Sequence, residues 1–168
     1  MRGWLGALGL TAALAVIAGP AEAQEAAGIP VGSKAPSVSV HDLDGKRVDL
    51  GQYIGRKPLL LEFWATWCEL CEELLPQVKA AHKEFGDQVE FLGVNVTGNQ
   101  TLGRVRRYLD THQPPFRTLY DDQGTSIRAY QVPTTSYVVV VDAGGKVVYT
   151  GTGGTQDIAA VLRGVTPH

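Results

Sequence analysis

The sequence predicts a single α/β domain with a central mixed sheet, helices on both faces of that sheet and an N-terminal β-hairpin extension. Apolar runs of strand length at residues 59–64 and 89–96 are each followed by a segment with helical spacing of apolar side chains. Residues 38–50 alternate apolar and polar side chains around an Asp-Gly pair, which is a strong hairpin signal. The chain finishes with a second hairpin, at a Gly-Gly pair, and a last helix.

The other elements follow from the same patterns. Residues 68–85 carry a helical apolar stripe, and Pro76 within it predicts a kink. The remaining expected elements are a helix at about 101–112, a short strand at 116–120, a short helix at 125–130, strands at 135–141 and 146–150, and a helix at about 155–163.

Length and charge narrow the class of protein. The chain has 168 residues, a hydrophobic fraction of 44% and a formal net charge of -2, which is typical of one globular domain. Its basic residues are scattered, except for the group Arg104, Arg106 and Arg107, which we interpret as a solvated helix face. Nucleic acid is therefore not an expected partner.

Residues 1–23 have the pattern of a secretory signal peptide. An early Arg2 precedes an apolar run, a Gly-Pro break and an Ala-Glu-Ala cleavage pattern. The alternative is an uncleaved membrane anchor, although the run is short of the ~20 residues that a spanning helix needs. We expect residues 24–33 to be a flexible leader and residues 34–168 to form the domain, which would be periplasmic or otherwise extracytoplasmic.

Both cysteines of the chain lie in one Cys-x-x-Cys, formed by Cys68 and Cys71 at the junction of a strand and a helix. Closing so short a loop removes little entropy from the unfolded chain, so a structural disulfide explains the pair poorly. The arrangement instead indicates thiol chemistry.

Together with a second motif, this pair resembles a known family. The segment FWATWCELC at residues 63–71, followed by VPTT at residues 132–135 and a hairpin, is similar to thioredoxin. Within that superfamily the chain looks most like the exported TlpA/ResA thiol-disulfide oxidoreductases, which add an N-terminal hairpin. The resemblance covers nearly all of the chain that would remain after removal of residues 1–23, and it implies a thioredoxin fold.

The sequence departs from the family pattern at three places. The residues between the cysteines are Glu69 and Leu70, whereas relatives often have proline as the second. Leu74 stands where ResA-type proteins often carry a functional glutamate. The approach to the proline of the second motif, residues 129–133, is a few residues shorter than usual.

Disulfide exchange needs an attacking thiolate and a second thiol that resolves the mixed disulfide. Cys68 is the expected nucleophile, because the N-terminus of a helix lowers a thiol pKa from its usual ~8.5. Cys71 is the expected resolving thiol. The carboxylates of Glu69, Glu72 and Glu73 oppose a second anion nearby, which favours a reductant or mild exchanger, although acidic residues are also ordinary in a first helical turn.

Glu62 lies in the middle of an apolar strand, where desolvation should raise its pKa. Its position relative to Cys68 matches the buried Asp of the thioredoxin family. We therefore expect it to exchange a proton with Cys71 during resolution. The alternative is an edge position from which the carboxylate reaches solvent.

The resemblance also assigns a substrate-binding loop. It implies a cis peptide before Pro133, with the backbone of Val132 pairing with an extended partner segment and Thr134 continuing the motif. The alternative is a trans proline at the beginning of a strand. Trp67 is expected to cover the surface of the site.

The function that these features predict is an exported thiol-disulfide oxidoreductase, of the protein-disulfide reductase type. The expected partners are a disulfide-containing protein, an apocytochrome c under maturation among the options, and a membrane-bound thiol-disulfide electron donor. No cofactor and no metal are implied, and the domain is expected to be a monomer. A thiol-dependent peroxidase of the redoxin type and a Cu(I)-binding chaperone stay open as alternatives.

Overall fold

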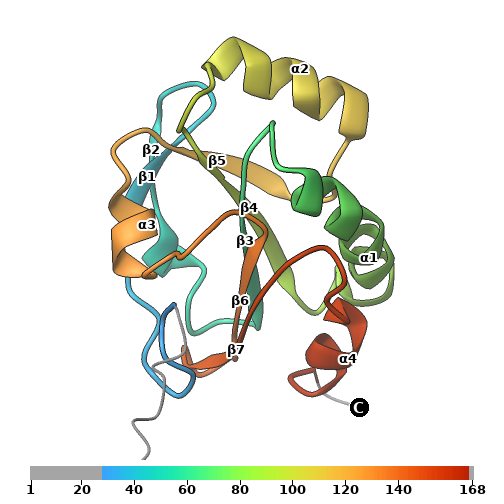
Figure 1. Cartoon of the computed structure of the whole chain (residues 1–168). Helices are drawn as coiled ribbons and strands as arrows, with labels where there is room; N and C mark the ends of the chain where they lie inside the picture. Colours follow the sequence, from blue (N-terminus) through green and yellow to red (C-terminus); the bar gives the residue numbers. More distant parts are fainter. Residues whose placement is uncertain (1–27, 167–168) are drawn as a thin grey trace, which may run out of the picture.

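The computed structural model describes residues 28–166. They form one seven-stranded sheet with the order β2-β1-β5-β4-β3-β6-β7 (Figure 1). Strands β3, β4 and β5 run parallel to one another, and the remaining pairings are antiparallel. The predicted mixed sheet of an α/β domain is confirmed.

The strands are between three and seven residues long. In chain order they are β1 (Ser39–Asp42), β2 (Arg47–Asp49), β3 (Leu59–Trp64), β4 (Glu90–Val96), β5 (Arg117–Asp121), β6 (Tyr137–Val141) and β7 (Val147–Thr152). Strand β3 is hydrogen-bonded on both sides, to β4 and to β6, and every one of its residues is buried. It is therefore a fully buried interior strand of the sheet, as its apolar sequence predicts.

The helices are α1 (Glu69–Phe85), α2 (Leu102–His112), α3 (Thr125–Ala129) and α4 (Ile158–Arg163), with a 3₁₀ turn, η1 (Leu50–Gln52), after β2. Thr101 caps α2 by accepting a hydrogen bond from the Arg104 amide. Asp157 does the same for α4 through the Ala160 amide. These caps stabilise the first turns of both helices, of which α2 begins within one residue of its expected start and α4 about three residues later.

Two apolar cores lie on opposite faces of the sheet. Leu59, Leu61 and Phe63 of β3 belong to one core, whereas Leu60 belongs to the other, beneath α1 and α4. Figure 1 shows α3 on one side of the strands and α1 with α4 on the other. The predicted helices on both faces are thus present.

The N-terminal hairpin is fastened to α2 by one arginine. The Arg106 guanidinium donates to the Leu43 carbonyl oxygen at 2.6 Å and to Asp44 Oδ1 at 2.8 Å. The helix face that we interpreted as solvated therefore also anchors the turn between β1 and β2.

Residues 28–33, which we expected in the leader, pack against the domain. Ile29 is buried, and its amide donates to the Tyr137 hydroxyl at 3.1 Å. The Gly32 amide donates to the Val147 carbonyl oxygen at 2.7 Å. The contacts of the domain therefore begin at residue 28, while the expected signal segment, residues 1–23, lies outside the described residues.

Within residues 28–166, none of the helices is both long enough and apolar enough to cross a membrane.

Strand β6 begins at Tyr137, two residues later than the β-branched sequence predicts. Residues 134–136 form a bend, and Ser136 adopts a left-handed backbone conformation with φ 57°. The chain therefore makes an extra turn before the sheet, directly beside the redox segment described below.

Candidate active site

Cys68 is the N-cap residue of α1, at the point where the chain leaves β3. Its backbone is extended, and its sulfur accepts a hydrogen bond from the Cys71 amide at 3.1 Å. Cys68 and Cys71 form a disulfide whose Cα atoms are 5.3 Å apart. Because an amide at a helix N-terminus favours negative charge, Cys68 is placed where a thiolate is stabilised over a thiol.

The disulfide lies between exposed apolar side chains. Both cysteines are buried, whereas Trp67 is 45% exposed and Leu70 is 47% exposed. Apart from Val31, these two are the large apolar side chains that residues 28–166 expose. Trp67 and Leu70 are thus exposed apolar side chains next to the two cysteines in the chain, and the role of Trp67 at the site stays a prediction.

A glutamine that the sequence did not single out holds this loop in place. The Gln100 side chain accepts a hydrogen bond from the Thr66 amide at 3.0 Å and donates to Asn95 Oδ1 at 3.0 Å and to the Val96 carbonyl. Trp67 Nε1 donates to the Gly98 carbonyl oxygen at 2.8 Å. The polar loop after β4 thus fixes the segment that precedes Cys68, although its composition indicated only a loop.

The other tryptophan belongs to the core. Trp64 is buried, and its ring lies 5.0 Å from that of Tyr108 and 6.3 Å from that of Phe116. It therefore packs α2 against the sheet.

The rim of the site is acidic. Glu69, Glu72 and Glu73 are all exposed on the first turns of α1. Four segments contribute to this end of the domain, residues 65–73, 97–101, 131–136 and 152–157, and their sequences contain no Lys or Arg. Among the ion pairs of residues 28–166, the partner of these carboxylates is a histidine ring, His112, whose Nε2 is 3.9 Å from Glu72 Oε1.

Glu62 is buried in the middle of β3, 2% exposed, between Gly93 of β4 and Val138 of β6. Alternation along the strand places it on the same face as Leu60, the face that α1 covers. Its Oε2 atom has no hydrogen-bond partner in the described part of the chain, and burial raises the pKa of the carboxyl to about 8. The carboxyl is therefore mainly protonated at pH 7, and its burial excludes the alternative edge position.

The expectation of a cis peptide before Pro133 is wrong. Residues 28–166 contain no cis peptide bond. The chain reverses instead through left-handed residues on either side of the proline, Gln131 with φ 50° and Ser136 with φ 57°.

The proline loop nevertheless meets the redox turn. Pro133 and Thr134 are exposed, Val132 is half-buried, and the Val132 amide donates to the Ile127 carbonyl oxygen at 2.9 Å. That amide is occupied, so a partner strand would have to pair with the Val132 carbonyl. Contact with the cysteine pair comes from Ser136, whose hydroxyl donates to the Leu70 carbonyl oxygen at 3.2 Å.

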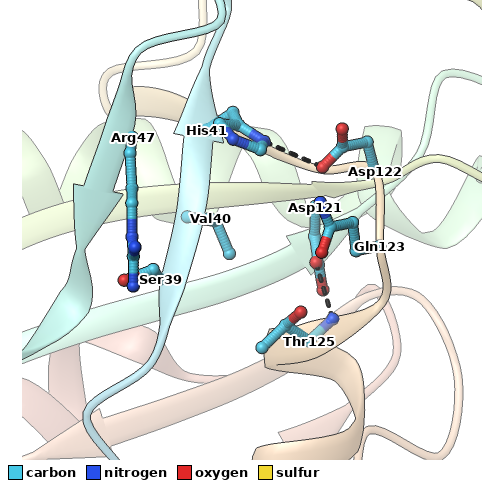
Figure 2. A pocket seen from close by; sticks show the side chains of 8 residues that line it. All are labelled: Ser39, Val40, His41, Arg47, Asp121, Asp122, Gln123 and Thr125. Atoms are coloured by element: carbon cyan, nitrogen blue, oxygen red, sulfur yellow. Dashed lines mark hydrogen bonds and ion pairs between the residues drawn. The ribbon is translucent and has the colours of Figure 1, made fainter.

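A polar cavity of about 330 Å³ lies elsewhere, between the N-terminal hairpin and the segment that follows β5. Figure 2 shows His41 paired with Asp122, at 2.9 Å, and Asp121 directed toward the start of α3. Asp121 accepts four hydrogen bonds there, from the amides of Thr125, Ser126 and Ile127 and from the Ser126 hydroxyl. Both carboxylate oxygens of Asp121 are thus already hydrogen-bonded to the start of α3, so Asp121 is not a candidate catalytic group in this cavity.

Comparison with known proteins identifies the class. Residues 31–150 match the model of the AhpC/TSA family, and the chain belongs to this family. ResA of Geobacillus thermodenitrificans, a thiol-disulfide oxidoreductase, is 34% identical over 146 residues, which cover 85% of this chain and 82% of that protein.

Other relatives have the same kind of name. ResA of Bacillus subtilis is 34% identical over 148 residues, which cover 88% of this chain and 78% of that protein. The thioredoxin-like protein YneN of Bacillus subtilis is 32% identical over 128 residues, 74% of each chain. With its Cys68–Cys71 disulfide, this protein is a ResA-like thiol-disulfide oxidoreductase.

Solved structures support the thioredoxin fold. The thioredoxin domain of a thiol-disulfide oxidoreductase from Bacteroides vulgatus has a TM-score of 0.71 at 21% identity and covers 82% of this chain and 99% of that one. The exposed lipoprotein thioredoxin Etrx1 of Streptococcus pneumoniae has a TM-score of 0.62 at 27% identity, covering 76% of this chain and 97% of that one. The fold predicted from the cysteine and proline motifs is confirmed.

The buried carboxyl predicts a pH-dependent stability. Its pKa is 4.5 when unperturbed and about 8 in the folded protein, so between these values the folded state binds a proton that the unfolded state has released. Stability should therefore fall as pH rises from 5 to 8, by up to about 4 kcal/mol. In Glu62→Gln, the free energy of unfolding, measured with denaturant at several pH values, should fall less steeply between pH 5 and 8, because this titrating group is absent.

Glu84→Gln, at an exposed carboxylate paired with Arg163, is the matched control and should retain the wild-type slope. The same pH slope in wild type and Glu62→Gln would show that Glu62 titrates normally.

Proposed function

We propose that the protein is an exported reductase of protein disulfides, in which Cys68 attacks and Cys71 resolves. The observation that carries this proposal is the placement of the Cys68 sulfur at the N-cap of α1, with the Cys71 amide donating to it. The exposed Trp67 and Leu70 supply an apolar surface for the partner.

The exchange proceeds in two displacements. The Cys68 thiolate attacks one sulfur of the partner disulfide, so a mixed disulfide forms and the other partner sulfur leaves as a thiolate. The Cys71 thiolate then attacks Cys68 Sγ, which forms the Cys68–Cys71 disulfide and releases the second partner thiolate. Two electrons pass from the cysteine pair to the partner, and a thiol-disulfide electron donor restores the dithiol.

In the second displacement Glu62 takes the proton of Cys71 through the fraction of its carboxyl that is ionised at the operating pH, which a pKa of about 8 leaves as a minority at pH 7. Three features support this role: the carboxyl is on the face covered by α1, its Oε2 lacks a partner within residues 28–166, and its pKa is raised to about 8. A base with a pKa near the operating pH is suited to proton transfer. The transfer would run directly or through one water molecule.

The direction of exchange follows from the acidic rim. Carboxylates near Cys68 raise the free energy of its thiolate, and a reduced form that is less stabilised is a better electron donor. With no Lys or Arg in the four segments around the site, nothing in those segments offsets Glu69, Glu72 and Glu73. We therefore assign the protein to the reducing side.

The proposed location and partners of this reaction are argued from the sequence and from the relatives. The pattern of residues 1–23 supports export, with the segment either cleaved or kept as an anchor. The donor would be a membrane-bound thiol-disulfide protein, and an apocytochrome c is one candidate substrate. We propose that the domain acts as a monomer.

A thiol-dependent peroxidase is the second candidate, since the matching family model is that of AhpC/TSA. The arrangement of the thiols favours exchange over this alternative. Cys71 lies one helical turn from Cys68 and already forms a disulfide with it, which is the geometry that resolves a mixed disulfide with a protein.

Serine variants of the two cysteines should stop disulfide exchange at different steps. With insulin as a disulfide substrate, Cys71→Ser should accumulate a mixed disulfide through Cys68, because the attack proceeds and the resolution does not. Cys68→Ser should form no adduct and lose exchange activity. Mass spectrometry under non-reducing conditions detects the adduct, and full activity in Cys68→Ser would refute the mechanism.

The reduction potential of the Cys68–Cys71 pair should lie near the reducing end of the thioredoxin range, about -270 mV. Equilibration with glutathione or with a reference thioredoxin measures it. A value near about -120 mV would place the protein among strong oxidants and overturn the assigned direction.

Loss of the buried carboxyl should slow resolution. At pH 7, Glu62→Leu should release the second partner thiol roughly 10²-fold more slowly, since general base catalysis is typically worth that much or more. The deficit should shrink at higher pH, where Cys71 ionises without help. Rapid-mixing kinetics of the mixed disulfide measure the step.

Thr118→Val is the control for this experiment, because Thr118 Oγ1 is also buried without a partner in the described chain, but on β5. Wild-type kinetics for Glu62→Leu at every pH would remove Glu62 from the mechanism.

A further inference from the structure

We propose that Ser136 is a positioning residue for the redox turn, and that its hydroxyl favours the disulfide form of Cys68 and Cys71 over the dithiol form. The inference rests on the proposed thiol-disulfide exchange and adds a residue that sets its equilibrium. No motif in the sequence marks this serine.

The Ser136 hydroxyl connects three parts of the chain that are far apart in sequence. It lies 3.2 Å from the carbonyl oxygen of Leu70, one of the two residues between the cysteines, and 3.1 Å from the carbonyl oxygen of Gly153, in the loop between β7 and α4. The residue is fully buried. Water therefore does not compete for its single proton.

One hydroxyl has one proton, so the two carbonyl acceptors compete for it. A bond to Leu70 holds the backbone between the sulfurs, whereas a bond to Gly153 holds only the neighbouring loop. When the turn is closed by the disulfide, both acceptors are within reach. A movement of Leu70 after reduction would leave the proton to Gly153 alone, at little cost to Ser136 itself.

The serine is itself held rigidly. Its carbonyl oxygen accepts from the Gly153 amide at 3.2 Å and from Gln156 Nε2 at 3.2 Å, while the same Nε2 donates to the Gly153 carbonyl oxygen at 2.8 Å. Gln156 Oε1 accepts from the Tyr149 hydroxyl at 3.1 Å. With both ends of its amide fixed, Gln156 keeps Ser136 in the left-handed conformation that points its hydroxyl at Leu70.

The same loop is attached to α1 beyond the redox turn. Gln77 Nε2 donates to the Gly154 carbonyl oxygen at 3.0 Å, and a β-carbon at Gly154 would collide with the Glu73 side chain. The loop therefore lies against the first three turns of α1. Ser136 extends this contact to the dipeptide between the cysteines.

The consequence is thermodynamic. A hydrogen bond changes a reduction potential only if it is stronger in one redox form, because equal stabilisation of both forms cancels. The Ser136–Leu70 bond is made with the cysteine Cα atoms 5.3 Å apart in the disulfide form. Holding Leu70 in this geometry raises the effective concentration of each thiol toward the other and so favours ring closure.

Removing the hydroxyl should therefore weaken the disulfide. In Ser136→Ala and in Ser136→Gly, the equilibrium constant for disulfide formation against glutathione should fall about five- to tenfold, a rise in potential of about 20–30 mV. Glycine tolerates the left-handed conformation and alanine does not, so the two variants should differ in stability but share the same shift.

A second readout separates positioning from general stability. The free energy of unfolding should fall more in the disulfide form than in the dithiol form, by the amount that the potential shift requires. Gln156→Met, which keeps the side-chain size but loses the amide, should shift the potential in the same direction and supports the inference if either serine variant fails to fold.

Ser126→Ala is the matched control. Ser126 is also fully buried and donates through its hydroxyl, to Asp121 Oδ2 at 2.6 Å, but at the start of α3. This variant should lose stability without a change in potential. A wild-type potential in the Ser136 and Gln156 variants, or an equal shift in Ser126→Ala, would overturn the inference alone.

Failure of the proposed function would look different. If wild-type Cys68 and Cys71 formed no reversible disulfide with the glutathione buffer, both the function and the inference would be overturned. A reversible wild-type pair whose potential is unchanged by the Ser136 variants would leave the function standing and remove only the role of the serine.

Discussion

The hydrogen bonding of β3 to both β4 and β6 is the constraint on which the site depends. It fixes the strand through six consecutive buried residues, so the direction in which the chain leaves the sheet is set before the redox turn begins. Cys68 itself has an extended backbone conformation, and in this conformation it forms the N-cap of α1. The chemistry of a helix N-terminus therefore lies at the carboxyl end of an interior strand, next to the exposed Trp67 and Leu70.

The same strand explains why one charge-bearing side chain is tolerated in the core. Glu62 has apolar neighbours and a carboxyl oxygen without a partner within residues 28–166, so it avoids the cost of a buried charge by remaining protonated. Such an arrangement lowers stability in neutral solution. A group of this kind is retained more easily when it performs a task than when an apolar residue could replace it.

Periodicity and local signals predicted most of the fold. The apolar run of β3, the Asp-Gly and Gly-Gly turns and the stripe of α1 each reflect contacts made within a few residues, and Cys68, Cys71 and Glu62 could be chosen because their chemistry is unusual for their positions. Ser136 and Gln100 could not, because an ordinary polar residue acquires its role from contacts dozens of residues away. The trans peptide before Pro133 shows the limit of a motif, because a short sequence match does not by itself fix the backbone geometry of a turn.

The packing of residues 28–33 determines how the domain would face its surroundings. Gly32 is bonded to Val147, and Val147 pairs with the end of β6 that lies beside the start of β3, whereas Cys68 follows the end of β3. The chain therefore enters the domain at the opposite end of the sheet from the disulfide (Figure 1). A domain held through its N-terminal segment would direct its cysteine pair outward from the point of attachment, leaving the acidic and apolar rim free to meet partners that diffuse past.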